Sequence, residues 1–354
     1  MTTPATVPLP PGLARRYSRG AEGRAWLASL PRLISDCLAQ WELVPDLAPG
    51  ALPWHGHGAV AVPVRRLADT KATGAAALKI AYPHDEALVE PHALTLWQGN
   101  GAVRLLASDA GAGALLLERL DAGHSLQDEP MDVAVPVWGG LVRSLGLQPD
   151  GRPQWREFGQ IAARAEQWSD ELPESWERLG RPFPRWLLEA ALEVCQTRGA
   201  VGRRSGTDVL VHTDLHFLNI LALPGIAAGT SPEGSAAADF KAIDPQPMVG
   251  EAEFAVAPLL WNRLAELPRS GPGEALLERC FDFSAAAGLD GDAARQWAVA
   301  REVDNALWYA ARRGHDGDLA RSLWVASTLA GNTLAGLPAA HELPAPGASA
   351  SLPD

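Results

Sequence analysis

Cysteine and long apolar runs are scarce in this chain of 354 residues. Its three cysteines, Cys37, Cys195 and Cys280, lie far apart, so they predict neither a disulfide framework nor a zinc ribbon and fit a reducing compartment. No apolar stretch approaches the roughly 18 residues of a membrane span, and the N-terminal residues lack the basic and apolar regions of an export signal. We therefore expect a cytoplasmic protein that does not enter a membrane.

Basic residues are also few. Acidic residues outnumber basic ones by 42 to 30, which gives a net charge of −12 and a pI near 5.2. This balance argues against nucleic acid or an anionic membrane as a partner, and it permits a cationic small-molecule substrate. Only three of the basic residues are lysines (Lys71, Lys79 and Lys241), so each lysine raises the question of a functional role.

The pattern of apolar residues predicts two lobes, which the chain length accommodates. Short β-type runs occupy 59–65, 75–80, 103–108 and 113–120, and helical patterns occupy 21–40 and 86–97. After Asp121 helical patterns dominate, over 132–147, 154–170, 185–198, 251–266, 273–287, 291–313 and 317–336. We predict an α+β fold with an N-terminal helix and small β-rich lobe over 1–117, a mainly helical lobe over 118–336, and a disordered tail over 337–354.

A motif in the second lobe carries the clearest chemistry. His212, Asp214 and Asn219 keep the order and the Asp-to-Asn spacing of the protein-kinase catalytic loop, and Asp244 follows 25 positions after Asn219. In such a loop the first Asp accepts the proton of the attacking hydroxyl, while the Asn and the later Asp hold Mg²⁺ against the nucleotide phosphates. We therefore predict phosphoryl transfer, with Asp214 as the catalytic residue and Asn219 and Asp244 as metal ligands.

The small lobe offers matching nucleotide-binding residues. Lys79 stands in a strand-like run, as does the kinase lysine that meets the α- and β-phosphates. Glu86 and Glu90 share one face of the following helix, and we favour Glu90 as the carboxylate that steadies the lysine. The segment 55–58 (His-Gly-His-Gly) stands where a phosphate-covering loop is expected, with a simple turn as the alternative.

Further residues are candidates for contacts with nucleotide or substrate. Glu118 and Leu120 lie where the chain crosses between the lobes, and we expect their main-chain groups to meet the purine edge. His216 follows Asp214 closely enough to reach the substrate or phosphate. Glu251 and Glu253 are carboxylates that a cationic amino- or guanidino-sugar would need.

Together these residues make the chain similar to the aminoglycoside phosphotransferase family, and more closely to its streptomycin 6-kinase and hydroxyurea phosphotransferase branch. The resemblance is carried by 211–219, 242–251 and 257–263, with a further match over 101–106 and 115–120. It implies a two-lobed, protein-kinase-like fold that binds ATP and Mg²⁺ and acts as a monomer or dimer. It also implies O-phosphorylation of a small molecule, first of all an aminoglycoside of the streptomycin type, with hydroxyurea or an amino-sugar as alternatives.

Two other interpretations stay open. His212, Asp214 and His216 alternate along the chain and form a compact ligand set for zinc or iron in a metal hydrolase. The sequence also departs from the family pattern at Gln246, where a basic residue is common, and at Ala255, where Asp is usual. These departures and the presence of only two glycines in 55–58 favour a kinase-like protein that binds a nucleotide or metabolite without turnover, whereas the intact Asp214, Asn219, Asp244 and Lys79 oppose it.

Overall fold

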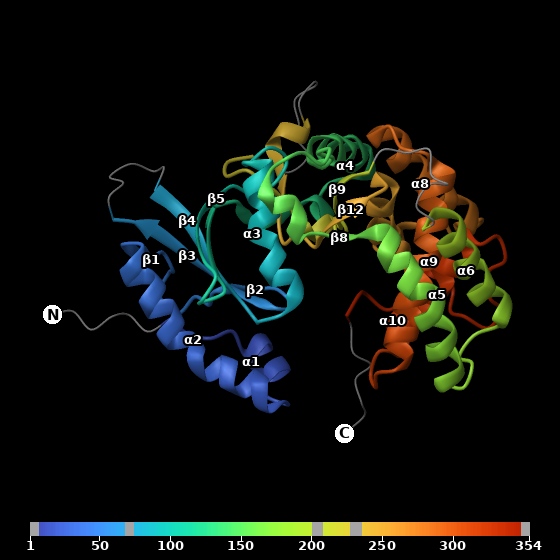
Figure 1. The fold of residues 1–354 in the computed structure, drawn as a ribbon, viewed down its shortest axis with the longest axis horizontal. Helices are drawn as coiled ribbons and strands as arrows, with labels where there is room; N and C mark the ends of the chain where they lie inside the picture. The colour runs from blue at the N-terminus through green and yellow to red at the C-terminus, as the bar shows by residue number, and fades with distance from the viewer. Residues whose placement is uncertain (1–6, 68–73, 200–207, 227–235, 348–354) are drawn as a thin grey trace.

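The chain alternates short strands with helices up to Glu118 and is mainly helical beyond it, as the sequence predicts (Figure 1). The computed structural model describes residues 7–67, 74–199, 208–226 and 236–347. We call 7–118 the small lobe and 119–347 the large lobe. No helix within the described ranges combines the length and the apolar character needed to cross a membrane.

One six-stranded antiparallel sheet forms the small lobe, with the order β1-β3-β4-β6-β5 and β2 paired to β3. Alternate residues of β4, such as Leu78 and Ile80, are fully buried in an apolar cluster that also contains Trp26 and Leu30 of α2. Because side chains alternate along a strand, Lys79 points to the opposite face of the sheet. The elements are α1 (Pro11–Tyr17), α2 (Ala21–Gln40), β1 (Leu43–Pro45), β2 (Trp54–His55), β3 (Ala59–Arg66), β4 (Ala75–Ala81), α3 (Asp85–Trp97), β5 (Leu105–Asp109) and β6 (Ala114–Glu118).

Two small sheets in the large lobe bring the catalytic segments together. β9 pairs antiparallel with β12, with His212 opposite Pro247, and β10 pairs antiparallel with β11, with Ile220 opposite Ala242. The turns that follow β9 and β11 therefore lie side by side. The strands are β7 (Asp121–Ser125), β8 (Gly159–Gln160), β9 (Val209–His212), β10 (Ile220–Ala222), β11 (Phe240–Ala242) and β12 (Pro247–Gly250).

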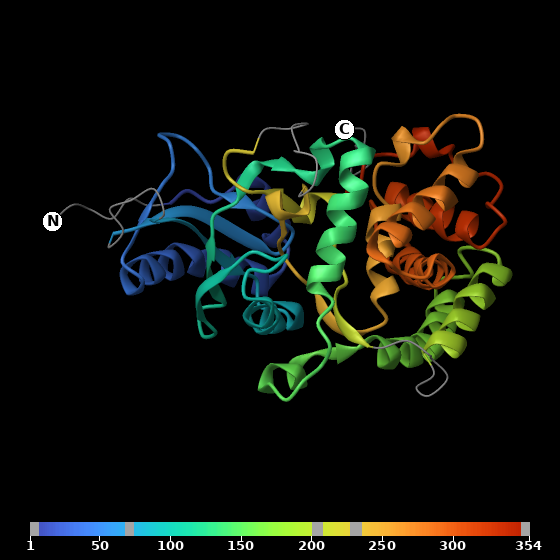
Figure 2. The same ribbon diagram turned by 90° about the horizontal axis from the view of Figure 1, so that it is seen from above.

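Helices surround these sheets and form the bulk of the large lobe (Figures 1 and 2). α3 of the small lobe also packs here, because Trp97 is buried in the large-lobe apolar cluster and its indole N–H donates to the carbonyl of Leu145 at 2.8 Å. The large-lobe helices are α4 (Met131–Leu145), α5 (Ile161–Arg178), α6 (Arg185–Arg198), α7 (Ala257–Leu260), α8 (Pro272–Ala287), α9 (Gly291–Ala310) and α10 (Asp316–Leu329).

Three expected helices differ from the structure. The pattern over 251–266 yields only the four residues of α7 between 3₁₀ turns, and Arg263, at φ +53°, turns the chain out of the helix. The helix expected at 154–170 begins only at Ile161, because Gly159 and Gln160 pair with β12. The last helix ends at Leu329, and Gly331, at φ +87°, turns the chain beyond it.

The tail expected from residue 337 is also wrong in its first part. Ala340 and Leu343 are buried, and Asp318 and Arg321 of α10 hydrogen-bond to main-chain atoms of Gly347 and Pro344. These contacts hold the segment against the large lobe. Residues 348–354 lie outside the described residues.

The crossing of α4 and α8 gives a first prediction. A Cβ on Gly139 would lie 2.5 Å from the main-chain carbonyl of Ala286, so Gly139→Ala forces the two helices apart. Alanine favours helices intrinsically, yet we expect this variant to lose about 1–3 kcal/mol of stability through overpacking. Urea unfolding measures the loss. Gly151→Ala, where a Cβ meets nothing within 4 Å, is the control and should unfold like the unmodified chain.

Candidate active site

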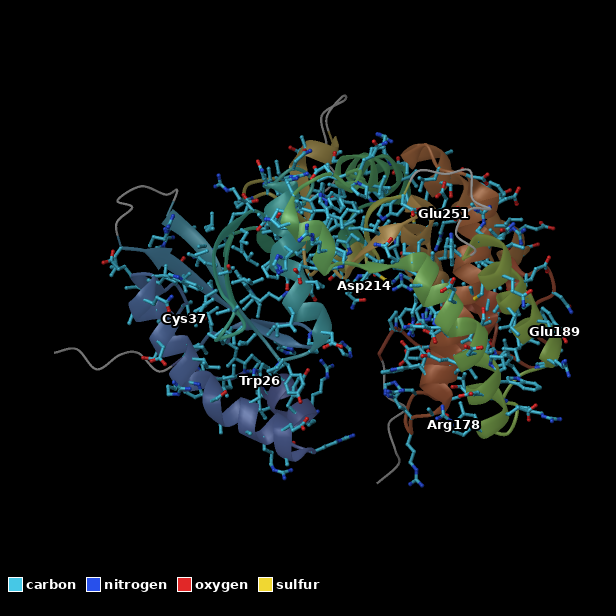
Figure 3. All side chains as sticks on the ribbon, viewed as in Figure 1. Trp26, Cys37, Arg178, Glu189, Asp214 and Glu251 are labelled. Atoms are coloured by element: carbon cyan, nitrogen blue, oxygen red, sulfur yellow. The ribbon has the colours of Figure 1, made fainter. Side chains whose placement is uncertain are left out.

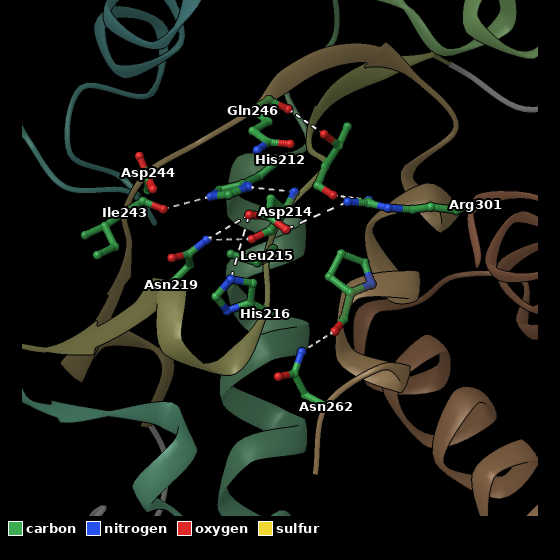
Figure 4. A network of polar contacts seen from close by, with 12 residues as sticks. His212, Asp214, Leu215, His216, Asn219, Ile243, Asp244, Gln246, Asn262 and Arg301 are labelled. Carbon is green, nitrogen blue, oxygen red and sulfur yellow. Dashed lines mark hydrogen bonds and ion pairs between the residues drawn. The ribbon is translucent and has the colours of Figure 1, made fainter. Parts of the chain in front are cut away.

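Asp214 lies in the loop between β9 and β10, between the small lobe and the large-lobe helices (Figure 3). The side-chain amide of Asn219 donates to the main-chain oxygen of Asp214 at 2.9 Å and to its carboxylate at 3.3 Å (Figure 4). Within the loop, the amide of His216 donates to the Asp214 carbonyl and the amide of Asn219 to the His216 carbonyl, each at 2.9 Å. The loop thus fixes the Asp214 carboxylate by short-range hydrogen bonds.

His212 supports this loop from behind. It is 2 % exposed; its Nε2 donates to the Ile243 carbonyl at 3.0 Å, and its Nδ1 accepts from the amide of Asp214 at 3.2 Å. Burial lowers the pKa of His212 to about 4, so the ring is neutral near pH 7 and serves as one donor and one acceptor. His212 therefore links the loop that carries Asp214 to the turn that carries Asp244.

Arg301 is a site residue that the sequence did not reveal. It projects from α9, donates to the main-chain oxygen of Thr213, and lies 3.8 Å from a carboxylate oxygen of Asp214. Its guanidinium also lies over the ring of Phe254 at 5.4 Å. No spacing in the sequence connects Arg301 with the catalytic motif, because the two are joined only through tertiary packing.

His216 lies beside Asp214, on the opposite side from Arg301 (Figure 4). The distance from its Nε2 to the Asp214 carboxylate is 3.7 Å, too long for a hydrogen bond, and its Nδ1 is buried without a hydrogen-bond partner in the described part of the chain. The ring is thus next to the Asp214 carboxylate, and none of the described residues uses its Nδ1.

A buried ion cluster lies on the small-lobe side of the site. The Lys79 ammonium contacts both oxygens of Glu90 at 2.7 and 2.6 Å and one oxygen of Asp244 at 2.6 Å. Burial lowers the pKa of Lys79, but the two carboxylates and their hydrogen bonds outweigh that effect and raise it overall, so the ammonium stays charged. The Lys79 charge in turn lowers the pKa of Asp244.

Asp244 is held in an unusual backbone conformation. Its φ is +54°, in the left-handed region, which costs a non-glycine residue about 1 kcal/mol or more. The preceding residue, Ile243, is fixed by its amide hydrogen bond to the Asn219 carbonyl at 2.8 Å. The Asp244 side chain remains 50 % exposed although one oxygen contacts Lys79. The turn thus presents a carboxylate to the space between the lobes.

The donor set fits Mg²⁺ better than a zinc-type metal. Mg²⁺ is bound by one or two protein oxygens with the rest from phosphates and water, and Asp244 offers an exposed carboxylate. The amide nitrogen of Asn219 is used by Asp214, and its oxygen points to the side on which Asp244 lies (Figure 4). Among the described residues no three His, Cys, Asp or Glu side chains gather closely enough to hold a metal ion.

The metal-hydrolase interpretation is therefore wrong in its geometry. Both ring nitrogens of His212 are used, one by the Ile243 carbonyl and one by the Asp214 amide. A neutral imidazole has one lone pair and one N–H in the ring plane. Both are engaged here, so no nitrogen is left to bind a metal. His212, Asp214 and His216 do not form a common ligand set.

Of the two residues where the chain crosses between the lobes, Glu118 makes a contact from one lobe to the other. The amide of Glu118 donates to the Arg104 carbonyl at 2.9 Å, and its carboxylate accepts from the amide of Arg104 at 2.7 Å and from the ammonium of Lys241 on β11. Leu120 is buried. The amide of Glu118 is thus already used, and any purine contact by the other main-chain groups of Glu118 and Leu120 stays a prediction.

Glu251 and Glu253 make structural contacts away from Asp214. Both oxygens of Glu251 accept from Arg198, and one also accepts from the indole of Trp297 at 2.7 Å, which joins α6 and α9 to the end of β12. A carboxylate oxygen of Glu253 accepts from the amide of Asp290, at the start of α9. Both oxygens of Glu251 are thus used inside the large lobe, which gives no geometric support to a substrate role for it; for Glu253, one oxygen of which is used, that role stays a prediction.

The two departures from the family pattern also have a structural setting. The main-chain carbonyl of Gln246 accepts from both the amide and the hydroxyl of Thr213, at 3.1 and 2.7 Å. Ala255 is buried and lines a cavity of about 10 Å³ together with His212 and Leu215. A side-chain carboxylate does not brace the loop here; main-chain groups and Arg301 do.

The fold and the site define a kinase-like phosphotransferase. Residues 40–146 and 204–314 match the family model described as aminoglycoside/hydroxyurea antibiotic resistance kinase. The chain is 34 % identical over 313 residues to the streptomycin 6-kinase of Streptomyces griseus, and the alignment covers 87 % of this chain and 92 % of the relative. It is 35 % identical over 340 residues to the hydroxyurea phosphotransferase of Kitasatospora aureofaciens, covering 92 % and 87 %.

Solved structures agree on the fold. An amicoumacin kinase in complex with AMP-PNP, Ca²⁺ and Ami superposes with a TM-score of 0.52 at 13 % identity; the match covers 94 % of this chain and 99 % of the kinase. The chain belongs to the aminoglycoside/hydroxyurea antibiotic resistance kinase family. It is an enzyme, a kinase of small molecules.

The buried His212 gives a second prediction, on pH and stability. Its pKa is 6.5 when unfolded and about 4 when folded, so its contribution is fully present above pH 6.5 and is lost as the pH falls to 4. This corresponds to about 3 kcal/mol. Between pH 7 and pH 5 about 2 kcal/mol of this is lost, while Glu302, whose pKa burial raises to about 7, changes the stability in the opposite sense. We therefore expect His212→Asn to be less stable than the unmodified chain at pH 7, and this difference in urea unfolding to shrink by about 2 kcal/mol at pH 5; a difference that does not change with pH would contradict the assignment.

Proposed function

We propose that this kinase transfers the γ-phosphoryl group of ATP to a hydroxyl of a small molecule, and that the acceptor is an aminoglycoside of the streptomycin type. The observation that carries the mechanism is the joint placement of the Lys79–Glu90–Asp244 cluster and the Asp214–Asn219 loop between the lobes. The acceptor class rests on the streptomycin 6-kinase relatives. Hydroxyurea, which the name of the Kitasatospora aureofaciens phosphotransferase gives, is the alternative acceptor.

Asp214 acts as the general base in this proposal. It takes the proton of the acceptor hydroxyl while the hydroxyl oxygen bonds to the γ-phosphorus, and the bond from that phosphorus to the departing ADP breaks. Asn219 orients the carboxylate through its side-chain amide. Arg301 lies near the other carboxylate oxygen and holds it in place from α9. Orientation, rather than a covalent intermediate, then supplies most of the rate gain.

The cluster on the small-lobe side binds the donor. Lys79 neutralises charge on the ATP phosphates, and Glu90 keeps its ammonium directed at them. Asp244 and the side-chain oxygen of Asn219 would hold Mg²⁺, which would offset phosphate charge. Because Lys79 and Asp244 come from different lobes, nucleotide binding in this way joins the lobes.

The experiment that tests the function is also a third prediction. Purified enzyme with ATP and Mg²⁺ should consume ATP in the presence of streptomycin, and Asp214→Asn should lower kcat by at least about 10²-fold while ATP still raises the melting temperature. Other aminoglycosides, amino-sugars and hydroxyurea complete the panel. Asp36→Asn, at an exposed carboxylate on α2, is the control and should keep full activity. ATP binding without turnover of any acceptor would favour a kinase-like binding protein.

Metal dependence gives a fourth prediction. ATP should raise the melting temperature more with Mg²⁺ than with EDTA, because Asp244 and the phosphates share the ion. In Asp244→Asn this Mg²⁺-dependent part should shrink strongly. Asp292→Asn, at an exposed carboxylate in the first turn of α9, serves as the control. An Mg²⁺ effect of the same size in both variants would remove Asp244 as a ligand.

A further inference from the structure

One face of α9 is directed at the loop that carries Asp214. Within 301–308 of this helix, the residues that are not buried are Arg301, Asp304, Asn305 and Trp308. Their spacings of three, four and seven positions place them on one face of the helix. Arg301 extends from this face to within 3.8 Å of the Asp214 carboxylate (Figure 4). Trp308 therefore lies on the side of α9 that is directed at Asp214, about 10 Å further along the helix.

Trp308 is the most exposed tryptophan in the described part of the chain, at 47 %. A ring of this size is normally buried, because removing its apolar surface from water stabilises the fold. Its orientation is fixed by edge-on ring contacts with Tyr309 at 5.0 Å and with His315 at 5.8 Å. An aromatic ring of fixed orientation is thus exposed to solvent on the α9 face that carries Arg301.

A guanidinium group already lies over this ring. The central guanidinium carbon of Arg312 is 3.6 Å from the centroid of the Trp308 ring, and the same group donates to the Trp308 carbonyl at 2.8 Å. Other arginines that lie over aromatic rings in the described ranges do so at 5.1 to 5.4 Å. Arg312 is exposed, and no carboxylate of the described residues forms an ion pair with it. The ring therefore accepts a guanidinium that no ion pair holds in place.

A carboxylate stands one helical turn before the ring. Asp304 precedes Trp308 by four positions, and the side chains of a helix lean toward its N-terminus, so the ring leans toward Asp304. The Asp304 side chain is 31 % exposed, and its nearest cation, Arg164 of α5, is 3.6 Å away and also pairs with Glu171. An aromatic face beside an incompletely neutralised carboxylate is a combination that binds organic cations.

The distance from this surface to Asp214 suits a substrate of moderate size. Burial raises the pKa of Tyr309, the residue after Trp308, and the Asp214 carboxylate is among the charges that raise it further, so the two lie within electrostatic range. The roughly 10 Å along α9 from the turn of Arg301 to the turn of Trp308 is the length of a molecule such as a disaccharide. One end of such a molecule can reach Asp214 while the other lies on Trp308.

We propose that Trp308 is a specificity-determining residue of the acceptor site, whose ring binds a guanidinium or ammonium group of the acceptor in place of Arg312, with Asp304 as the neighbouring carboxylate. The proposal rests on the proposed function, because it names a contact of the acceptor in the same transfer. Arg312 occupies the ring when the acceptor is absent and moves into solvent when the acceptor binds. A neutral acceptor gains nothing from this contact.

The test measures binding, so it does not depend on turnover. Streptomycin is titrated calorimetrically into the enzyme with Mg²⁺ and AMP-PNP. We expect Trp308→Ala to raise the streptomycin dissociation constant roughly tenfold and Trp308→Phe to raise it less, because a phenyl ring also attracts cations. Arg312→Ala should lower the constant several-fold, because the internal competitor is gone. Asp304→Asn should raise it several-fold.

The control is Phe281→Ala, which removes an exposed aromatic ring of α8. Phe281 packs on Gly291 at the opposite end of α9, so streptomycin binding should not change. No streptomycin binding to the unmodified enzyme, or an unchanged constant in Trp308→Ala, would overturn the proposal. A rise in Arg312→Ala equal to that in Trp308→Ala would also overturn it, because the pair would then only stabilise the end of α9.

Steady-state kinetics separates this proposal from the proposed function. If streptomycin is turned over, Trp308→Ala should raise its KM with little change in kcat, and the KM of the neutral hydroxyurea should not change. Binding of streptomycin that depends on Trp308 but is not followed by transfer would support the role of Trp308 and contradict the proposed function. Turnover with the same streptomycin KM in Trp308→Ala would do the reverse.

Discussion

The Lys79 ammonium is the interaction on which the arrangement of this site depends. It joins β4, α3 through Glu90, and the turn after β11 through Asp244, so one charged cluster connects both lobes. Removing Lys79 would leave the buried Glu90 carboxylate without its counter-charge, which costs several kcal/mol. On the hinge side, the ion pair of Glu118 with Lys241 makes a second connection between the lobes. These polar contacts set where the site carboxylates lie, while the two apolar clusters stabilise the lobes around them.

The loop that carries Asp214 depends on a second set of contacts, made by His212, by the main chain of Gln246 and by Arg301. His212 spans from the loop to Ile243, the residue before Asp244, so Asp214 and Asp244 are both placed by one neutral ring. Thr213 is fixed twice by the Gln246 carbonyl and once by Arg301. This arrangement explains how the loop stays ordered without a carboxylate at position 255. The support that family resemblance assigns to a side chain is provided here by main-chain oxygens and by an arginine on α9.

The sequence could predict the parts of the site that are local. The spacing from His212 to Asn219 reflects one tight loop, and the alternation along β4 sets Lys79 opposite its buried neighbours, so both are visible as patterns. Glu90 is one helical turn from Glu86, so the sequence could favour Glu90 as the partner of Lys79 but could not decide between the two. Arg301 could not be found, because it meets Thr213 across 88 positions and only the packing of α9 brings them together. The contacts of Glu251 could not be found for the same reason, because a carboxylate in sequence gives no sign that Arg198 and Trp297 will donate to it.

Nucleotide binding and phosphoryl transfer require different features of this site, and the described residues bear on both. Well-packed apolar residues in place of a buried ion cluster are often neutral or stabilising, so stability alone does not explain Lys79, Glu90 and a strained Asp244. A site that receives anionic phosphates explains them, but a protein that only binds nucleotide would need them equally. Asp214 is different, because nucleotide binding does not require its carboxylate to be oriented by Asn219 and flanked by Arg301. An oriented base next to a phosphate site serves the acceptor hydroxyl, and this feature favours turnover over binding alone.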